Sequence, residues 1–127
     1  MKNIGIDLGS RYVKLVKESN GSIEYNIFDT VSFYKQFIAR NGAETYIDTN
    51  KLGLSDDYKI VATGYGRNLM SFSNVEIISE IKAHFRGALK QTGNDSFILI
   101  DIGGQDSKVI LGKEGYIEDF IMNDKCA

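Results

Sequence analysis

The sequence has no proline and only one cysteine, Cys126. A single cysteine excludes an internal disulfide and agrees with a reducing compartment, so we expect a cytoplasmic protein. Average usage would give about six prolines in a chain of this length. The turns therefore have to be located from glycine and asparagine.

The sequence also lacks a basic stripe and a long apolar run. Its formal net charge is −2, and no segment clusters the Lys and Arg residues that binding along a nucleic acid requires. There is no run of about 18 apolar residues, and no charged N-terminal region followed by an apolar stretch. We therefore expect neither nucleic acid nor a membrane as a partner. The composition, 43% hydrophobic and 25% charged, suits one ordinary folded core.

What the sequence does contain is an internal repeat. Residues 4–16 align without a gap on residues 98–110, at a constant offset of 94 residues. Each copy predicts a buried strand, an Asp at its end, a glycine-containing turn, and a return strand that carries a Lys. The identical pairs are Ile4/Ile98, Ile6/Ile100, Asp7/Asp101, Gly9/Gly103 and Lys14/Lys108.

The two turns suit a polyphosphate. Gly9 and the pair Gly103-Gly104 allow a positive φ and carry no Cβ, so backbone N–H groups can point at an anion, and Ser10 adds a hydroxyl donor. Asp7 and Asp101 would repel phosphate directly, but a partly hydrated Mg²⁺ can bridge carboxylates to phosphates. An Asp-x-Gly turn after a strand is by itself an ordinary hairpin. The duplication favours the phosphate-binding interpretation.

Strand patterns dominate both ends of the chain. Residues 3–8, 12–18 and 23–29 predict an antiparallel meander with a turn at Asn20-Gly21. A strand over residues 58–63, separated from the meander by a helix, predicts a parallel crossover. Three further strands are expected near the C-terminus, over residues 97–102, 107–111 and 116–121.

Two helices are expected between these strands. Thr30 or Ser32 can cap the first helix, which Asn41-Gly42 interrupts and which residues up to Leu52 could continue. Its apolar positions are Val31, Tyr34, Phe37 and Ile38. The second helix has two alternatives. Either it begins at a capping box, Ser73-x-x-Glu76, or residues 75–78 form a short strand and the helix begins near Ser79. We favour the second, with the helix ending near Gly93.

Several motifs together resemble a known family. They are Gly5-Ile-Asp-Leu-Gly-Ser10, Ala62-Thr-Gly-Tyr-Gly-Arg67, Ser79-Glu-Ile-Lys-Ala-His84, Ile100-Asp-Ile-Gly-Gly-Gln-Asp-Ser-Lys108 and Met122-Asn-Asp-Lys-Cys-Ala127. The meander resembles the phosphate-binding half of the actin, hsp70 and sugar-kinase superfamily. More narrowly, the motifs are similar to activators of 2-hydroxyacyl-CoA dehydratases and to the ATPase subunits of benzoyl-CoA reductase.

The resemblance implies an α/β fold. It would be a ribonuclease H-like (actin-type ATPase) domain with a mixed sheet in residues 1–94, which holds the first phosphate loop. Residues 95–127 would be the opening strands of a second, incomplete copy with the second phosphate loop. The resemblance also implies an ATP-driven homodimer with one [4Fe–4S] cluster at its interface. Such a dimer takes electrons from reduced ferredoxin or flavodoxin and passes a low-potential electron to a 2-hydroxyacyl-CoA dehydratase.

The same resemblance assigns site residues. The first ATP/ADP phosphate loop would be Asp7, Gly9 and Ser10 with Lys14 nearby, and the second would be Asp101, Gly103, Gly104 and Gln105. Asp7 and Asp101 would hold Mg²⁺ through water and position the attacking water, with Asp101 the better candidate for orienting it. Cys126 would ligate iron in the cluster.

Three residues or segments can each be interpreted in two ways. Lys108 is either a phosphate contact or a solvated charge. Residues 63–66 either face the cleft or form a structural corner. His84 shares a helix face with Glu80 and either has a catalytic or switch role or borders the core.

The chain departs from the family by stopping at Ala127, before a second ligand Cys and the adenosine-binding residues. We therefore expect weak nucleotide binding and no turnover from this chain alone. Two alternatives stay open: a small-molecule kinase of the same superfamily, and a non-catalytic fragment that self-associates. Strands 97–121 are apolar on both faces, which predicts a homo-oligomer, with the terminal hairpin exchanged between chains as one form.

Overall fold

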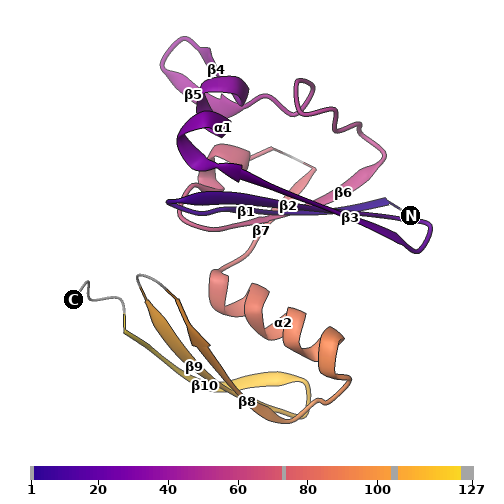
Figure 1. Cartoon of the computed structure of the whole chain (residues 1–127), viewed down its shortest axis with the longest axis vertical. Coiled ribbons are helices and arrows are strands. Elements are labelled where there is room, and N and C mark those ends of the chain that lie inside the picture. The colour runs from indigo at the N-terminus through magenta and orange to yellow at the C-terminus, as the bar shows by residue number, and fades with distance from the viewer. Residues whose placement is uncertain (1, 73, 104–105, 124–127) are drawn as a thin grey trace. The chain divides into compact units, whose positions relative to one another are not determined.

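The computed structural model describes residues 2–72, 74–103 and 106–123. The chain divides into two compact units, Met1–Ile78 and Ser79–Ala127 (Figure 1). The first unit contains β1 (Lys2–Leu8), β2 (Tyr12–Ser19), β3 (Ser22–Asp29), α1 (Thr30–Phe37), β4 (Ile38–Asn41), β5 (Glu44–Ile47), β6 (Tyr58–Thr63), the 3₁₀ helix η1 (Arg67–Met70) and β7 (Val75–Ile77). The second contains α2 (Glu80–Thr92), β8 (Phe97–Ile102), β9 (Ser107–Lys113) and β10 (Tyr116–Asn123). The predicted domain boundary after residue 94 stays a prediction, although α2 groups with the strands that follow it.

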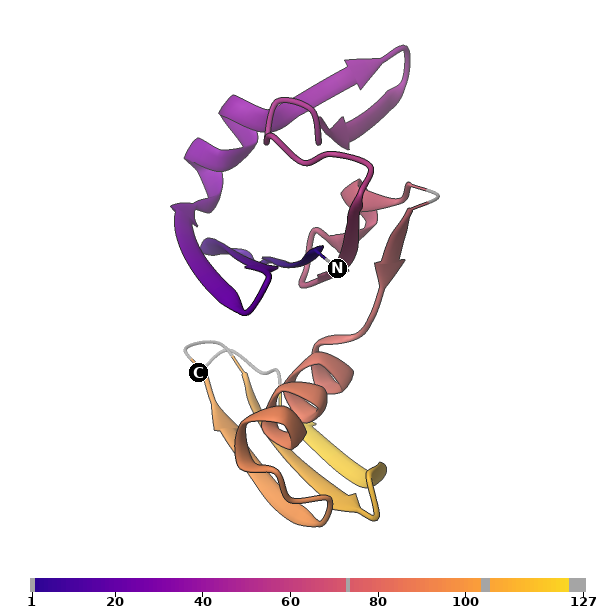
Figure 2. The same ribbon diagram turned by 90° about the vertical axis from the view of Figure 1, so that its right-hand side faces the viewer.

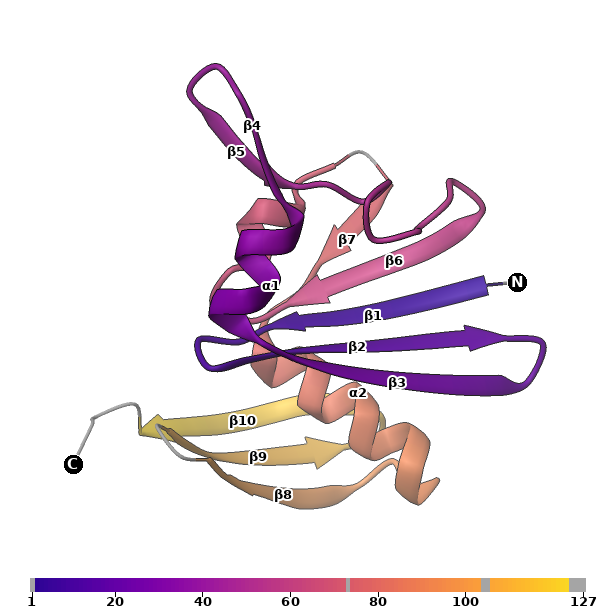
Figure 3. The same cartoon turned by 45° about the horizontal axis from the view of Figure 1, so that its top comes forward.

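A mixed sheet organises the first unit. Its strand order is β3-β2-β1-β6-β7 (Figure 3). Strands β1, β2 and β3 form the predicted antiparallel meander, and β6 pairs with β1 in parallel, as expected for a crossover connection. Asn20 and Gly21, both with positive φ, form the turn between β2 and β3. Because β1 and β6 run in the same direction, their carboxyl ends meet at one edge of the sheet.

Alternate residues of these strands build the core of the first unit. The side chains that point to one face of the sheet are almost completely buried, and they pack with Phe33 and Phe37 of α1 and with Met70. Burying side chains of this size stabilises a fold by about 1.5–3 kcal/mol each. The strand members of this core are Ile4, Ile6, Leu8, Val13, Leu15, Ile60 and Ala62.

Helix α1 corrects two details of the sequence prediction. Its N-cap is Asp29, whose carboxylate accepts a hydrogen bond from the Ser32 backbone N–H at 3.0 Å. The predicted caps were Thr30 or Ser32, but Thr30 donates its hydroxyl to the Gly9 carbonyl at 2.8 Å. The buried face contains Phe33, whereas Val31 is 62% exposed. Phe37, Tyr34 and Ile38 contact the core as predicted, so the predicted apolar stripe was wrong at Val31 and missed Phe33.

The helical pattern does not continue past Asn41-Gly42. Strands β4 and β5 form an antiparallel hairpin there, with Gly42 at a φ of +64°. The Asp48 N–H donates to the Phe37 carbonyl at 2.8 Å and closes the base of the hairpin. Asn-Gly is a strong hairpin signal, and here it outweighs the helical period of the apolar residues around it.

In the second unit, α2 lies on an antiparallel sheet with the order β10-β9-β8 (Figure 2). Ser79 caps the helix by accepting from the Lys82 N–H at 3.2 Å, and Gly93 ends it in the left-handed conformation. The favoured alternative, a short strand followed by a helix, is confirmed. Gly112 lies directly under the Phe85 ring, where any Cβ would clash. The core of this unit consists of Ile81, Phe85 and Ile110 with Leu89, Phe97, Leu99 and Ile117.

The opposite face of this sheet carries exposed apolar side chains, which we call the open face. The pairing register places these residues together, since Ile98 lies opposite Leu111, Ile100 opposite Val109, and Val109 opposite Ile121. The open face consists of Ile98, Ile100, Ile102, Val109, Leu111 and Ile121, which are 37–80% exposed. The expectation that both faces lack a covering helix is correct for this face only, because α2 covers the other.

No helix in the described parts of the chain is both long and apolar enough to cross a membrane.

Candidate functional site

The sequence repeat is also a structural repeat. Asp7 of β1 lies opposite Lys14 of β2, and Asp101 of β8 lies opposite Lys108 of β9. Each Asp stands near the carboxyl end of the first strand of an antiparallel hairpin, and each Lys stands near the start of the return strand. The predicted pair of hairpins is confirmed.

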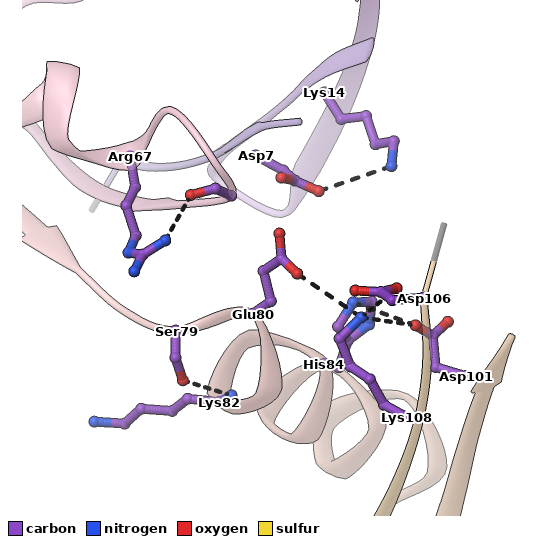
Figure 4. Close-up of polar contacts among 11 residues, drawn as sticks. Asp7, Lys14, Arg67, Ser79, Glu80, Lys82, His84, Asp101, Asp106 and Lys108 are labelled. Carbon is purple, nitrogen blue, oxygen red and sulfur yellow. Dashed lines mark hydrogen bonds and ion pairs between the residues drawn. The ribbon is translucent and has the colours of Figure 1, made fainter. Parts of the chain in front are cut away.

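In the first unit, a row of polar side chains crosses three strands. Lys14, Asp7 and Thr63 are register neighbours on β2, β1 and β6, so their side chains share one face of the sheet. The Lys14 ammonium is 3.7 Å from Asp7 Oδ2 (Figure 4). Asp7 Oδ1 and Thr63 Oγ1 are buried, and neither has a hydrogen-bond partner among the described residues. Two buried polar atoms thus lie near the carboxyl ends of two parallel strands.

The loop after β6 lies against Asp7. Gly64 has a φ of +97°, and a Cβ there would lie 2.5 Å from Asp7 Oδ1 and 2.7 Å from the Leu8 backbone. The Gly66 N–H donates to the Leu8 carbonyl at 2.9 Å. Arg67 Nη1 donates to the Gly64 carbonyl at 2.9 Å (Figure 4). Only glycine allows this close approach, so the loop is both a structural corner and one wall of the Asp7 site.

The glycines of the two predicted phosphate turns match one part of the expectation, the absence of a Cβ, but not the other. Neither Gly9 nor Gly103 has a positive φ. Both leave space instead: a Cβ on Gly9 would lie 2.6 Å from the Tyr12 carbonyl oxygen, and one on Gly103 would make a tight contact of 3.0 Å with the Asp106 carbonyl oxygen. A side chain would therefore collide with the opposite arm of the turn at Gly9, whereas at Gly103 it would require a small shift of that arm.

Lys108 is the centre of a charged cluster in the second unit. Its side chain is 3% exposed, which rules out the solvated-charge alternative. Its ammonium lies 3.0 Å from Asp106 Oδ1, 3.4 Å from Asp101 Oδ2 and 3.7 Å from Glu80 Oε2 (Figure 4). Burial lowers the pKa of Lys108, but hydrogen bonds and charge from Asp106 and Asp101 outweigh burial and hold this pKa above its ordinary value.

Helix α2 contributes the other members of this cluster. His84 Nε2 is 3.8 Å from Asp101 Oδ2, while Glu80, one turn earlier, points to Lys108 (Figure 4). The sequence placed Glu80 and His84 on one helix face, but it gave no signal that the face meets the Asp101 hairpin. Glu80 and Asp106 are therefore members of the candidate site that sequence reasoning missed.

Three predicted site residues, Gly104, Gln105 and Cys126, lie outside the described residues. Among residues 2–72, 74–103 and 106–123, no group of three or more His, Cys, Asp or Glu side chains could hold a metal ion. A cavity of about 420 Å³ between β5 and η1, lined in part by Tyr46, Asn68 and Phe72, does not include Asp7.

The two buried oxygens that have no hydrogen-bond partner among the described residues suit a hydrated cation. A water bound to a metal ion donates two hydrogen bonds, and Asp7 Oδ1 and Thr63 Oγ1 are two acceptors near the same strand ends. Mg²⁺ keeps several waters and binds proteins through one or two carboxylates. The donor set of the first unit is therefore compatible with a Mg-nucleotide.

Named relatives are similar in sequence over all or almost all of this chain. The sequence is 37% identical to the 2-hydroxyisocaproyl-CoA dehydratase activator of Clostridioides difficile, over all of this chain and 47% of that protein. It is 35% identical to the (R)-2-hydroxyglutaryl-CoA dehydratase activating ATPase of Acidaminococcus fermentans, over 98% of this chain and 47% of that protein. The chain thus spans about half the length of the curated relatives it matches.

Solved structures agree on the fold. The crystal structure of the Acidaminococcus fermentans (R)-2-hydroxyglutaryl-CoA dehydratase component A matches all of this chain and 49% of its own, with a TM-score of 0.73 and 30% identity. MreB5 of Spiroplasma citri matches 97% of this chain and 52% of its own, with a TM-score of 0.57 at 15% identity, which supports the fold alone. The predicted actin-type α/β class with a mixed sheet is confirmed.

A family model covers almost the complete sequence. The match extends over residues 4–127 and includes both Asp-Lys hairpins. The predicted resemblance is confirmed, and the chain belongs to the BadF/BadG/BcrA/BcrD ATPase family.

Proposed function

We propose that this chain supplies the two phosphate loops of an ATP-hydrolysing activator of a 2-hydroxyacyl-CoA dehydratase. The observation that carries the proposal is Asp7, whose buried Oδ1 has no partner among the described residues at the carboxyl end of β1. Relatives over the whole chain are named as dehydratase activators. An acceptor kept free at a strand end is what a Mg-nucleotide site requires.

Each loop has a distinct part in binding. In the first loop, Gly9 and Ser10 would contact phosphate, Asp7 would hold the Mg²⁺ through water, and Lys14, which is 57% exposed, would be free to approach a phosphate oxygen. The bound Mg²⁺ would neutralise charge on the phosphates.

In the second loop, Gly103, Gly104 and Gln105 would contact phosphate, and Asp101 would orient the attacking water. Water attack breaks the bond between the terminal phosphorus and the bridging oxygen of ADP. A carboxylate that accepts a hydrogen bond from that water aligns it for attack. Lys108 and His84 contact one Asp101 oxygen and would fix the direction of the carboxylate. Direct contact of Lys108 with phosphate stays part of the proposal.

The redox part of the proposal concerns Cys126. A [4Fe–4S] cluster needs four thiolates, and a dimer of this chain brings two, because the sequence has one cysteine. Cys126 would ligate iron only together with the additional cysteines that the resemblance implies. Electrons would come from reduced ferredoxin or flavodoxin in the cytoplasm and pass to the dehydratase. Anaerobic iron-sulfur reconstitution of this chain should give no stable cluster, and a stable four-iron cluster would contradict the half-site argument.

The open face supports the proposed self-association. Six exposed apolar residues on one sheet face are the kind of surface that a second copy can cover. We expect a dimer or a larger oligomer, with exchange of the terminal hairpin between chains as one form. Light scattering at micromolar concentration tests this expectation, and a monomeric mass would contradict it.

Calorimetric titration with Mg-ADP and Mg-ATP tests the nucleotide site. We expect weak binding by the chain, lost in Asp7→Asn and reduced in Asp101→Asn, and no measurable turnover. Absence of binding by the unaltered chain would remove the proposed function and leave the non-catalytic, self-associating fragment. Steady hydrolysis abolished by Asp7→Asn or Asp101→Asn would show that the chain is more active than we propose. Transfer of phosphate to a small alcohol would favour the alternative, a kinase of the same superfamily.

A further inference from the structure

The fold of the described residues does not explain why residue 63 carries a hydroxyl. It is the last residue of β6 and the register partner of Asp7. Its Oγ1 is buried and makes no hydrogen bond to any described residue. A buried hydroxyl without a partner destabilises a protein relative to an apolar group of the same shape. Valine would serve a purely structural purpose better at this position.

Hydrogen bonds fix the backbone that follows Thr63. The Gly66 N–H is bonded to the Leu8 carbonyl, and the Gly64 carbonyl accepts from Arg67. Gly64 leaves only 2.5 Å between Asp7 Oδ1 and a hypothetical Cβ. Asp7 and Thr63 are therefore held side by side on neighbouring strands, whose backbones lie about 4.8 Å apart in a sheet.

Two neighbouring acceptors favour one kind of ligand. A phosphate oxygen is itself an acceptor and is repelled by the Asp7 carboxylate, so it does not suit this pair of atoms. A water bound to a cation has two O–H donors, and a metal ion already occupies its lone pair. It needs two acceptors at once, which Asp7 Oδ1 and Thr63 Oγ1 supply.

We propose that Thr63 is a positioning residue of the Asp7 site, whose hydroxyl shares with Asp7 Oδ1 a water in the hydration shell of the nucleotide-bound divalent cation. This inference rests on the proposed function and adds a residue to it. It also explains why a hydroxyl is kept at a position where it costs stability in the absence of nucleotide.

The test compares Thr63→Val, Thr63→Ser and the matched control Thr45→Val, which makes the same substitution at an exposed position of β5. Binding of Mn²⁺-ADP is followed by electron paramagnetic resonance, and binding of metal-free ADP by calorimetry. We expect Thr63→Val to weaken Mn²⁺-ADP binding about tenfold, the loss typical of one hydrogen bond near a charge. Thr63→Ser should bind within about twofold of the unaltered chain. Metal-free ADP should bind equally to all variants.

Thermal unfolding supplies a second readout. Thr63→Val should unfold at the same temperature as the unaltered chain or a higher one, because it removes an unpaired hydroxyl. Unchanged Mn²⁺-ADP binding by Thr63→Val would overturn the inference, and so would an equal loss for metal-free ADP. The inference would also be overturned if Thr63→Val were less stable than the unaltered chain and Thr63→Ser showed the same losses of stability and binding as Thr63→Val. If the unaltered chain binds no Mn²⁺-ADP, the proposed function fails first, which separates the two failures.

Discussion

The two Asp-Lys hairpins share a register but differ in what surrounds the lysine. Lys14 is 57% exposed and faces Asp7 at 3.7 Å, whereas Lys108 is 3% exposed and contacts three carboxylates. The difference comes from α2, which places Glu80 over the second hairpin, and from Asp106 in the turn. The second copy is held in place by its own charges, while the first keeps a carboxylate oxygen that has no hydrogen-bond partner in the part of the chain that the structure describes. One motif thus forms a preorganised cluster in the second unit, and in the first unit a site that the proposed Mg-nucleotide would complete.

The largest effect is expected from Gly64→Ala, which tests whether the first site depends on the approach of the loop to Asp7. A positive φ costs a residue with a Cβ about 1–2 kcal/mol, and the contact with Asp7 Oδ1 adds about 1–3 kcal/mol. We expect a loss of about 3 kcal/mol in urea unfolding. Gly21→Ala is the matched control, since Gly21 has a φ of +80° with nothing within 4 Å. It should lose only about 1 kcal/mol, and equal losses would show that the close approach is unimportant.

Lys108→Met addresses the second site. Removing one partner of a buried ion pair typically costs about 3–5 kcal/mol. We expect about 2 kcal/mol here, because the three carboxylate side chains around Lys108 are 27–35% exposed and water can solvate them in part. Chemical denaturation of the variant and of the unaltered chain measures the loss. A variant as stable as the unaltered chain would mean that the cluster is not needed for folding.

The pKa of Lys108 predicts a pH dependence. Because its folded pKa is raised above the ordinary value of 10.5, its contribution to stability is complete below that pH and is lost as pH rises through the folded pKa. The stability difference between the unaltered chain and Lys108→Met should therefore shrink above pH 10.5. Burial also raises the pKa of Tyr34, so the comparison is best made in a Tyr34→Phe background. A difference that stays constant up to about pH 12 would contradict the assignment.

The smallest effect on stability is expected at Lys14. An exposed ion pair contributes about 0–1 kcal/mol, so Lys14→Met should change the free energy of unfolding by less than about 0.5 kcal/mol. Under the proposed function it should still weaken Mg-ADP binding. A stability loss as large as that of Lys108→Met would remove the contrast between the two hairpins.

Local signals in the sequence were sufficient for much of this fold. The strand over residues 58–63, the Ser79 cap and the Gly93 C-cap follow from short-range chemistry, and each is found where it was predicted. The repeat also predicted that each Asp and Lys would lie on adjacent strands. These features depend on residues only a few positions apart.

What the sequence did not indicate depends on distant partners. The burial of Lys108 requires Glu80, 28 positions earlier, and no local pattern marks that contact. The need for glycine at position 64 arises from Asp7, on a different strand. The Asp29 cap was missed because Thr30 and Ser32 are equally good capping residues. In the structure the Thr30 hydroxyl donates to the distant Gly9 carbonyl, and the Ser32 N–H donates to Asp29.

The half-covered sheet of the second unit has a consequence for its heat capacity. Unfolding raises heat capacity in proportion to the apolar surface that becomes newly hydrated. The open face is already hydrated in the folded chain, so its six side chains add little to this change. The second unit should therefore have a flatter stability curve than its length suggests. If a second copy covers the open face, calorimetry should show the heat capacity change increasing with protein concentration.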